Sequence, residues 1–130
     1  MKYLCLVYYD EKKLDALSKR EFDALVGDAL AYDDVMRQGG HYVASEALQS
    51  VQTATTIRTR DGKPSMTDGP FAETKEQLGG FILIEARDLN EAIQVASKIP
   101  PGRLGSIEVR PIKALSVIAA ASRRIPMCSV

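Results

Sequence analysis

Two helix-capping motifs, each followed by an amphipathic segment, constrain the fold of this chain most strongly. Ser18 stands three residues before Glu21, and Asp88 stands three residues before Glu91. In such a capping box the first side chain accepts from the backbone N–H three residues on, and the glutamate can reach back to the cap. We expect a long helix over about residues 19–38, ended by a Gly-Gly pair, and a shorter one ended by a Pro-Pro-Gly sequence.

The long helix has an apolar stripe at steps of three and four residues, which is typical of a helix that covers a sheet. The members of the stripe are Phe22, Leu25, Val26, Ala29 and Met36. Only Asp33 interrupts it.

Short apolar or β-branched runs predict strands before, between and after the helices. They lie at residues 2–9, 41–45, 54–60, 63–67, 80–86 and 106–111, and a polar loop is expected at 10–13. Asp61-Gly62 is a strong signal for a two-residue hairpin turn between the third and fourth runs. The order β-α-β-(hairpin)-β-α-β predicts an α+β sandwich with two helices on one face of a mostly antiparallel sheet, close to the ferredoxin-like arrangement.

Composition excludes several classes of function. Lys plus Arg and Asp plus Glu each number 17, so the net charge is zero and gives no general attraction to nucleic acid or to a membrane. No apolar run approaches the roughly 20 residues that span a bilayer. Cys5 and Cys128 have neither zinc-site nor redox-motif spacing, and the absence of a leader-like segment favours a cytoplasmic protein. A lone histidine without Cys or His partners predicts no metal site. The sequence has no Gly-rich phosphate loop, and it does not indicate which cofactor, if any, is used.

Residues 113–130 differ from the domain that we place at 1–112. The run from Ala114 to Ala121 is apolar and has no matching surface in the core described above. We expect this C-terminal tail to pack on its own domain or on a dimer partner, because exposing Leu115, Val117 and Ile118 forgoes about 1.5–3 kcal/mol each.

The candidate site is the stretch Asp68-Gly-Pro-Phe-Ala-Glu-Thr-Lys-Glu-Gln-Leu-Gly-Gly80, which holds three carboxylates and one ammonium beside an apolar strand. Asp68 can cap the Gly-Pro turn, or it can serve as an acid/base or ligand anchor whose pKa is raised by apolar neighbours. We expect Asp68, Glu73 and Lys75 to be held by ion pairs that include a strand-borne arginine, Arg58 or Arg110, because close carboxylates repel one another.

The sole histidine and the two arginines complete the set of candidate residues. His41 follows the Gly-Gly that ends the long helix, and it is a candidate for an auxiliary catalytic or ligand role there. Arg58 and Arg110 are candidate anion clamps because a guanidinium binds carboxylates bidentately.

The motif from Asp68 to Glu76 resembles the signature of the DGPF group of YCII-related proteins. The runs at residues 2–8, 54–58 and 108–111 also match, so the resemblance covers about residues 1–112. It implies a ferredoxin-like fold whose sheets pair into a dimeric α+β barrel. It does not imply one reaction, because similar folds serve several kinds of enzyme.

Two hypotheses for function follow. The first is a small cytoplasmic enzyme that transfers protons on a small organic acid or lactone-like substrate, with Asp68 as the acid/base. The alternative is a non-catalytic ligand-binding or regulatory module. In either case we expect a homodimer, because two helices leave the other face of a single sheet uncovered.

Overall fold

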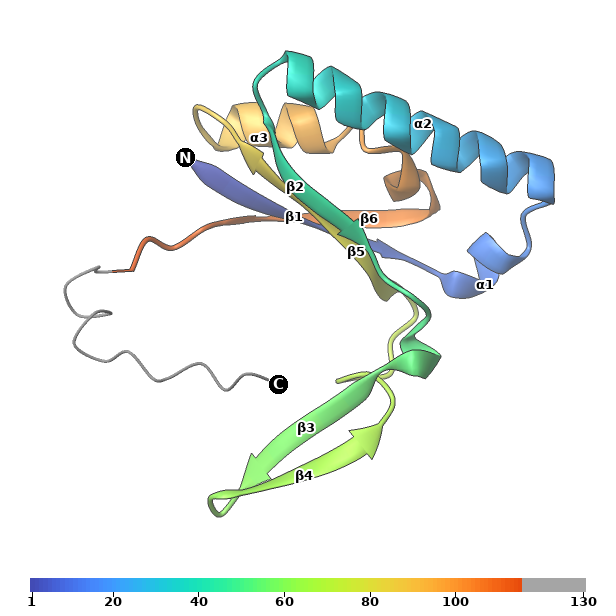
Figure 1. Ribbon diagram of the computed structural model, residues 1–130, viewed down its shortest axis with the longest axis vertical. Coiled ribbons are helices and arrows are strands. Elements are labelled where there is room, and N and C mark those ends of the chain that lie inside the picture. The colour runs from blue at the N-terminus through green and yellow to red at the C-terminus, as the bar shows by residue number, and fades with distance from the viewer. Residues whose placement is uncertain (116–130) are drawn as a thin grey trace.

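The computed structural model of the protein describes residues 1–115 (Figure 1). In chain order the elements are β1 (Lys2–Tyr9), α1 (Glu11–Asp15), α2 (Lys19–Gln38), β2 (Tyr42–Ala47), the 3₁₀ turn η1 (Val51–Thr53), β3 (Thr55–Arg60), β4 (Lys63–Asp68), β5 (Gln77–Glu85), α3 (Leu89–Ala96), the 3₁₀ turn η2 (Pro100–Leu104) and β6 (Gly105–Pro111). Most of the tail predicted at 113–130 lies outside the described residues, so its packing stays a prediction.

The main sheet has the strand order β2-β5-β1-β6, and every neighbouring pair is antiparallel. Helices α2 and α3 lie on the same side of this sheet (Figure 1). This is the ferredoxin-like α+β arrangement predicted from the order of helices and strands. No helix of the described part of the chain is long and apolar enough to cross a membrane.

The two helix starts confirm the capping motifs, one in full and one in part. Ser18 Oγ accepts from the N–H of Glu21 at 3.1 Å, and the Glu21 carboxylate accepts from the N–H of Ser18 at 3.0 Å. Asp88 accepts from the N–H of Glu91 at 2.9 Å, but Glu91 reaches the N–H of Arg87 instead of the cap.

The loop predicted at residues 10–13 is wrong in part, because α1 begins there. Asp10 caps this short helix by accepting from the N–H of Lys12 at 3.0 Å. The carboxylate of Glu11 then accepts from Ser50 Oγ at 2.8 Å and from the N–H of Val51 at 3.0 Å, which ties α1 to η1. A long-range anchor of this kind leaves no local signal in the sequence.

The core lies between the sheet and the helices. Alternate residues of β1, Tyr3, Cys5 and Val7, are buried on this side, and Ile82 and Ile84 of β5 join them. From the helical side the core receives Met36 of α2 together with Ala92, Val95 and Ala96 of α3 and Ile99 after it. Burial raises the pKa of the Cys5 thiol to about 11, as expected for a structural cysteine.

The other face of the sheet, which we call the open face, has no helix on it. Because side chains alternate along a strand, Leu4 and Leu6 of β1 point to this face together with their β5 partners Leu83 and Phe81. All four are only half-buried. The open face therefore has an apolar centre that nothing in the described part of the chain covers fully.

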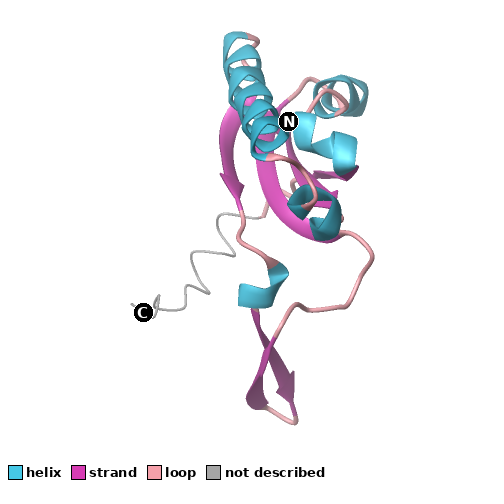
Figure 2. Cartoon of the chain, turned by 90° about the vertical axis from the view of Figure 1, so that its right-hand side faces the viewer, coloured by secondary structure: helices cyan, strands magenta, loops and turns pink. Residues whose placement is uncertain are grey.

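Strands β3 and β4 form a separate two-stranded sheet, which we call the arm (Thr55–Asp68). Its turn is the predicted Asp61-Gly62 pair, with φ of 52° and 75°. Positive φ at both residues is what a two-residue hairpin turn with the twist of the flanking strands requires. The arm projects away from the main sheet (Figures 1 and 2).

Candidate functional site

Asp68 is the last residue of β4 and its side chain is exposed. The N–H of Gly69 after it binds the carbonyl of Ala54 at 2.8 Å, so the turn is held by backbone. The Asp68 carboxylate forms no hydrogen bond or ion pair with any residue that the structure describes. The prediction that Asp68 caps the turn is wrong, because the carbonyl of Ala54, just before β3, already accepts from the turn.

The ion pairs predicted for the motif are also absent from residues 1–115. Glu73 and Lys75 are both exposed and unpaired there. Arg58 instead donates to the carbonyl of Phe71 at 2.9 Å and lies over its ring, 5.8 Å from the centroid. Arg110 lies 3.8 Å from Glu108 on the same strand. The prediction was wrong because the motif loop offers Arg58 a nearer backbone acceptor and reaches β6 only at its start, where Glu76 accepts from Ser106 Oγ at 2.8 Å.

His41 lies at the C-terminal end of α2, as predicted. Its N–H donates to the carbonyl of Met36, and its Nδ1 lies 2.8 Å from the carbonyl of Glu85, so this nitrogen carries the proton. Glu85 ends β5, whereas the motif precedes its start at Gln77. At about 3.4 Å per residue these ends are roughly 27 Å apart, so the fold does not bring His41 and Asp68 together. The catalytic or ligand roles of the six predicted residues stay predictions.

Two hollows remain as candidate sites. The first, the motif cleft, has a volume of about 780 Å³ and lies between η1, the root of the arm and the motif loop. It includes Phe71 and Thr74 of the motif and Tyr8 and Leu78 of the open face, but none of the six predicted site residues. Apart from Tyr8, its lining has no ionisable side chain.

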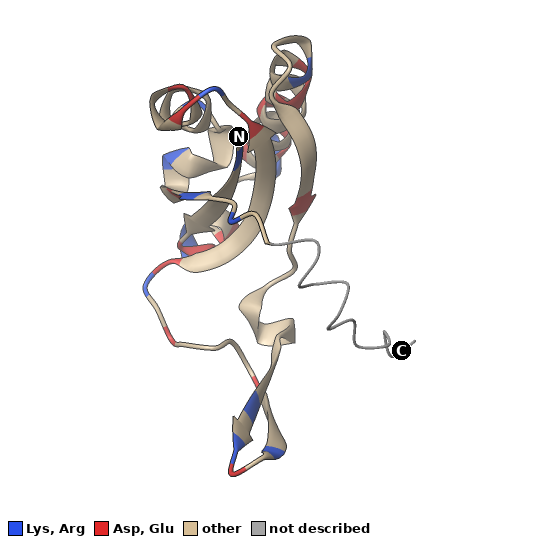
Figure 3. Cartoon of the chain, turned by 90° about the vertical axis from the view of Figure 1, so that its left-hand side faces the viewer, with Lys and Arg blue, Asp and Glu red and all other residues tan. Residues whose placement is uncertain are grey.

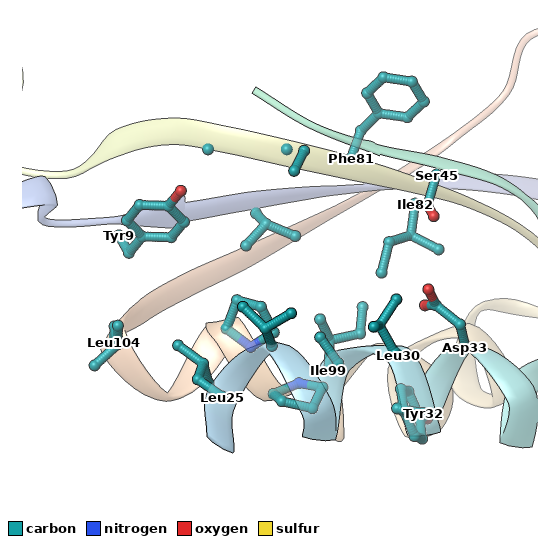
Figure 4. A pocket seen from close by; sticks show the side chains of 18 of the residues that line it. Tyr9, Leu25, Leu30, Tyr32, Asp33, Ser45, Phe81, Ile82, Ile99 and Leu104 are labelled. Atoms are coloured by element: carbon teal, nitrogen blue, oxygen red, sulfur yellow. The ribbon is translucent and has the colours of Figure 1, made fainter. Parts of the chain in front are cut away.

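The second hollow, the interlayer cavity, lies between α2 and the helix-facing side of the sheet and has a volume of about 430 Å³ (Figure 4). Its lining from α1 and α2 consists of Leu14, Phe22, Leu25, Val26, Ala29, Leu30, Tyr32 and Asp33. The sheet, η2 and the segments beside them contribute Val7, Tyr9, Ser45, Glu46, Ala47, Leu48, Gly79, Gly80, Phe81, Ile82, Ile99, Pro100, Pro101 and Leu104.

The cavity exists because α2 touches the sheet closely only near its C-terminal end. Met36 is the one fully buried residue of this helix. Phe22 and Val26 of the apolar stripe remain 41% and 40% exposed, and Leu30 beside the stripe is 63% exposed. The predicted stripe therefore faces a hollow, whereas a tightly packed helix would bury it.

Gly79 fixes one wall of the cavity. A Cβ atom at this position would lie only 2.2 Å from the ring of Tyr9, so the absence of a side chain lets that ring lie against β5. Burial raises the pKa of the Tyr9 phenol, with smaller contributions from Glu11 and Asp15. The Tyr9 hydroxyl is therefore neutral and can donate a hydrogen bond at this end of the cavity.

Asp33 and Ser45 form the polar part of the cavity. The two side chains point toward one another from α2 and β2 (Figure 4). Ser45 Oγ lies 2.7 Å from the hydroxyl of Tyr42, whereas the Asp33 carboxylate has no hydrogen-bond or ion-pair partner among residues 1–115. Burial raises the pKa of Asp33, an effect that Arg37 opposes and Asp34 reinforces.

Asp33 was not predicted as a site residue, although the sequence carries a signal for it. It is the single polar interruption of an apolar helical stripe, and such a residue is often solvated at the margin of a core. Only the structure shows that it faces a hollow. Within the described residues, no group of three or more His, Cys, Asp and Glu side chains is placed to hold a metal ion.

Comparison with known proteins identifies the family of this chain. An uncharacterized protein, R00369 of Rhizobium meliloti (strain 1021), is 38% identical over 114 residues, which is 86% of this chain and 92% of that protein. Among solved structures, 5-chloro-2-hydroxyhydroquinone dehydrochlorinase (TftG) of Burkholderia phenoliruptrix AC1100, in complex with 2,5-dihydroxybenzoquinone, has a TM-score of 0.49 at 15% identity and covers 88% of this chain and 96% of that one. Membership of the narrower DGPF group stays a prediction. The profile of the YCII-related domain matches residues 1–116, and the chain belongs to the YCII-related family.

Proposed function

We propose that this protein binds a small, uncharged and largely apolar molecule in the interlayer cavity and exchanges a proton with it through Asp33. The observation that carries the proposal is a carboxyl group of raised pKa, without a protein partner in the described chain, at the polar end of an otherwise apolar cavity. Perturbed carboxyl groups in apolar pockets are the usual sites of acid/base chemistry.

The size of the cavity suits a small molecule. Its volume of about 430 Å³ lies toward the lower end of the range for ligand pockets, which is roughly 300–1,000 Å³. The partly exposed α2 residues Phe22, Val26 and Leu30 line it, so a bound molecule removes apolar surface of α2 from water.

The charge of the lining selects against anions. The ionisable side chains that reach it are Asp33, Tyr9 and Tyr32, because Glu46 pairs with Phe81 and points to the open face, and none of its residues is a cation. An ionised organic acid meets only like charge there, which disfavours binding. Of the two substrate classes expected from the sequence, we therefore favour lactone-like molecules over organic acids, and we add neutral alcohols and ketones of similar size.

The polar groups can serve both halves of a proton transfer. In its protonated form Asp33 can donate to a carbonyl oxygen, and as a carboxylate it can accept a proton from a hydroxyl group or from carbon next to a carbonyl. Ser45, opposite, can hold the same oxygen by donating its hydroxyl proton. A non-catalytic ligand-binding role uses the same contacts without proton transfer.

Two probes of matched shape test binding. We expect benzyl alcohol to shift the amide NMR signals of residues that line the cavity, and benzoate to bind at least about tenfold more weakly at neutral pH, a difference of about 1.4 kcal/mol. Equal binding of the two probes, or shifts confined to the open face, would show that the cavity is not the site.

Proton exchange is tested separately with cyclohexanone in D₂O, by following deuterium uptake at the carbons next to its carbonyl. The wild-type protein is expected to accelerate uptake and Asp33→Asn to abolish the acceleration. Asp23→Asn is the matched control, because Asp23 is an exposed residue of the same helix that pairs with Lys19 at 2.8 Å and does not line the cavity. Binding of benzyl alcohol without accelerated exchange would favour the ligand-binding alternative.

A further inference from the structure

Tyr9 supplies a second polar group to the interlayer cavity. The hydroxyl groups of Tyr3, Tyr32 and Tyr42 all have hydrogen-bond partners, whereas that of Tyr9 has none among residues 1–115. The side chain of Tyr9 is only half-buried, but it lies against an apolar wall. A tyrosine hydroxyl in such a place usually has a partner, because leaving a donor unpaired is costly. The Tyr9 hydroxyl is therefore free to bind a group that enters the cavity.

A β-bulge sets the position of the Tyr9 ring. The register of β1 against β5 shifts between Val7 and Tyr8, which leaves Gly79 without a partner on β1. The outer end of the Tyr9 ring, including its hydroxyl oxygen, lies directly over Gly79, where a Cβ atom would overlap it. Bulges are common next to binding sites, where they redirect a side chain. Here the bulge keeps the hydroxyl at the helix-facing side of β5, at one end of the cavity.

The two polar ends of the cavity lie apart along β5. Asp33 and Ser45 face one another at one end, and Tyr9 lies at the other (Figure 4). Ser45 pairs with Ile82, three residues along β5 from Gly79 and one strand to the side. A rise of about 3.4 Å per residue and a strand spacing of about 4.8 Å place the two ends roughly 11 Å apart. Two hydrogen bonds of about 2.8 Å each leave roughly 5–6 Å between the end atoms of a ligand that reaches both.

The wall between the two ends is apolar and uncharged. Leu25 and Ile99 lie between them on the helical side of the cavity (Figure 4). On the sheet side, residues 3–9 of β1 and residues 77–84 of β5 include no charged residue, so the two central strands are uncharged along the cavity (Figure 3). The middle of a ligand therefore meets only apolar groups, and its hydrogen bonds are confined to its ends.

The chemistry of the two ends defines the class of ligand. Burial raises the pKa of the Tyr9 phenol most, and the negative charges of Glu11 and Asp15 raise it further, so an anion meets like charge at this end too. We propose that the cavity selects neutral, elongated molecules with an oxygen atom at each end, one bound by Asp33 and Ser45 and the other by the Tyr9 hydroxyl. This inference rests on the proposed function, because it assigns a ligand class to the same cavity.

The test compares three probes by NMR titration of the full-length protein: benzyl alcohol, 4-hydroxybenzyl alcohol and 3-hydroxybenzyl alcohol. The 4-hydroxyl group lies opposite the CH₂OH group and reaches Tyr9, whereas the 3-hydroxyl group points to the side. We expect 4-hydroxybenzyl alcohol to bind at least about fivefold more tightly than benzyl alcohol, a difference of about 1 kcal/mol, which is the usual net gain from one hydrogen bond. The 3-hydroxy isomer is expected to gain less than about twofold, because its second oxygen misses Tyr9.

Tyr9→Phe tests whether the gain comes from the Tyr9 hydroxyl. It removes one oxygen atom that has no hydrogen bond in the described chain, so folding is preserved, and a thermal melt checks this. We expect the preference for 4-hydroxybenzyl alcohol over benzyl alcohol to disappear in Tyr9→Phe. Tyr3→Phe is the matched control, because Tyr3 lies on the same face of β1 but does not line the cavity, and it should keep the preference.

The inference and the proposed function fail in different ways. If benzyl alcohol binds in the cavity and the 4-hydroxyl group adds no affinity, or if Tyr9→Phe keeps the preference, the inference is overturned and the proposed function stands. An equal gain for the 3-hydroxy isomer also overturns the inference, because the position of the second oxygen then does not matter. If none of the probes shifts the signals of residues that line the cavity, both are overturned.

Discussion

Replacement of Ala29 by leucine tests whether the interlayer cavity is open in solution. Ala29 is half-buried on α2 and lines the cavity, so the longer side chain enters empty space. The change adds three carbon atoms, and at about 0.8 kcal/mol for each buried CH₂ group their burial gains up to about 2.4 kcal/mol. Fixing the leucine side chain costs about 0.5–1 kcal/mol. We therefore expect Ala29→Leu to raise the free energy of unfolding by about 1–2 kcal/mol.

The assay is urea denaturation combined with a thermal melt, in which the gain corresponds to a rise in Tm of about 4–8 °C. Ala24→Leu is the matched control, because Ala24 lies on the same helix but is exposed and does not line the cavity. The small difference in helix propensity between the two residue types is the same at both positions. Ala29→Leu should also lose binding of benzyl alcohol, because the new side chain occupies the cavity. If Ala29→Leu instead lowers the free energy of unfolding by about 1–3 kcal/mol, the usual cost of overpacking a filled core, the reasoning is refuted.

Three further predictions concern single residues. Ser18→Ala should lower the free energy of unfolding by about 1 kcal/mol, because both halves of the capping box are formed; an unchanged denaturation midpoint would contradict this. Asp68→Asn should change stability by less than about 0.5 kcal/mol, because Ala54 and not Asp68 accepts from the turn; a loss near 1 kcal/mol would restore the capping role. The raised pKa of Asp33 means that the folded state binds this proton more tightly than the unfolded chain does. The protonated carboxyl group therefore contributes to the free energy of unfolding below the ordinary aspartate pKa, and this contribution is lost as the pH rises through the raised pKa. Asp33→Asn should be more stable than the wild type near neutral pH, and the difference in stability should shrink in acid.

The two longer helices, the hairpin and the strands were predictable because their signals are local. Ser18 with Glu21, and Asp61 with Gly62, each determine a few backbone hydrogen bonds whatever surrounds them. The short apolar run of β1 likewise identified a strand. The short helix α1 was missed because Glu11 is anchored by residues about 40 positions away.

The candidate site was much less predictable. The motif was predicted as the site because it has many charges close together in sequence. Such a pattern does not show whether a cation from another strand lies near. In the described chain neither Arg58 nor Arg110 forms an ion pair with a carboxylate of the motif. The placement of Asp33 depends on how far α2 stands from the sheet, which is a tertiary distance. The β-branched pattern of this segment likewise predicts a strand, but it does not show that Ile57 and Met66 are exposed.

The most direct test of the central claim is a measurement of intermolecular nuclear Overhauser effects between the aromatic protons of benzyl alcohol and the methyl groups of the protein. Contacts are expected to Leu25, Ile82 and Ile99, which line the interlayer cavity from α2, β5 and the segment before η2. Contacts only to Leu4 and Leu6 on the open face, or none at saturating alcohol, would contradict the claim that this cavity is the binding site.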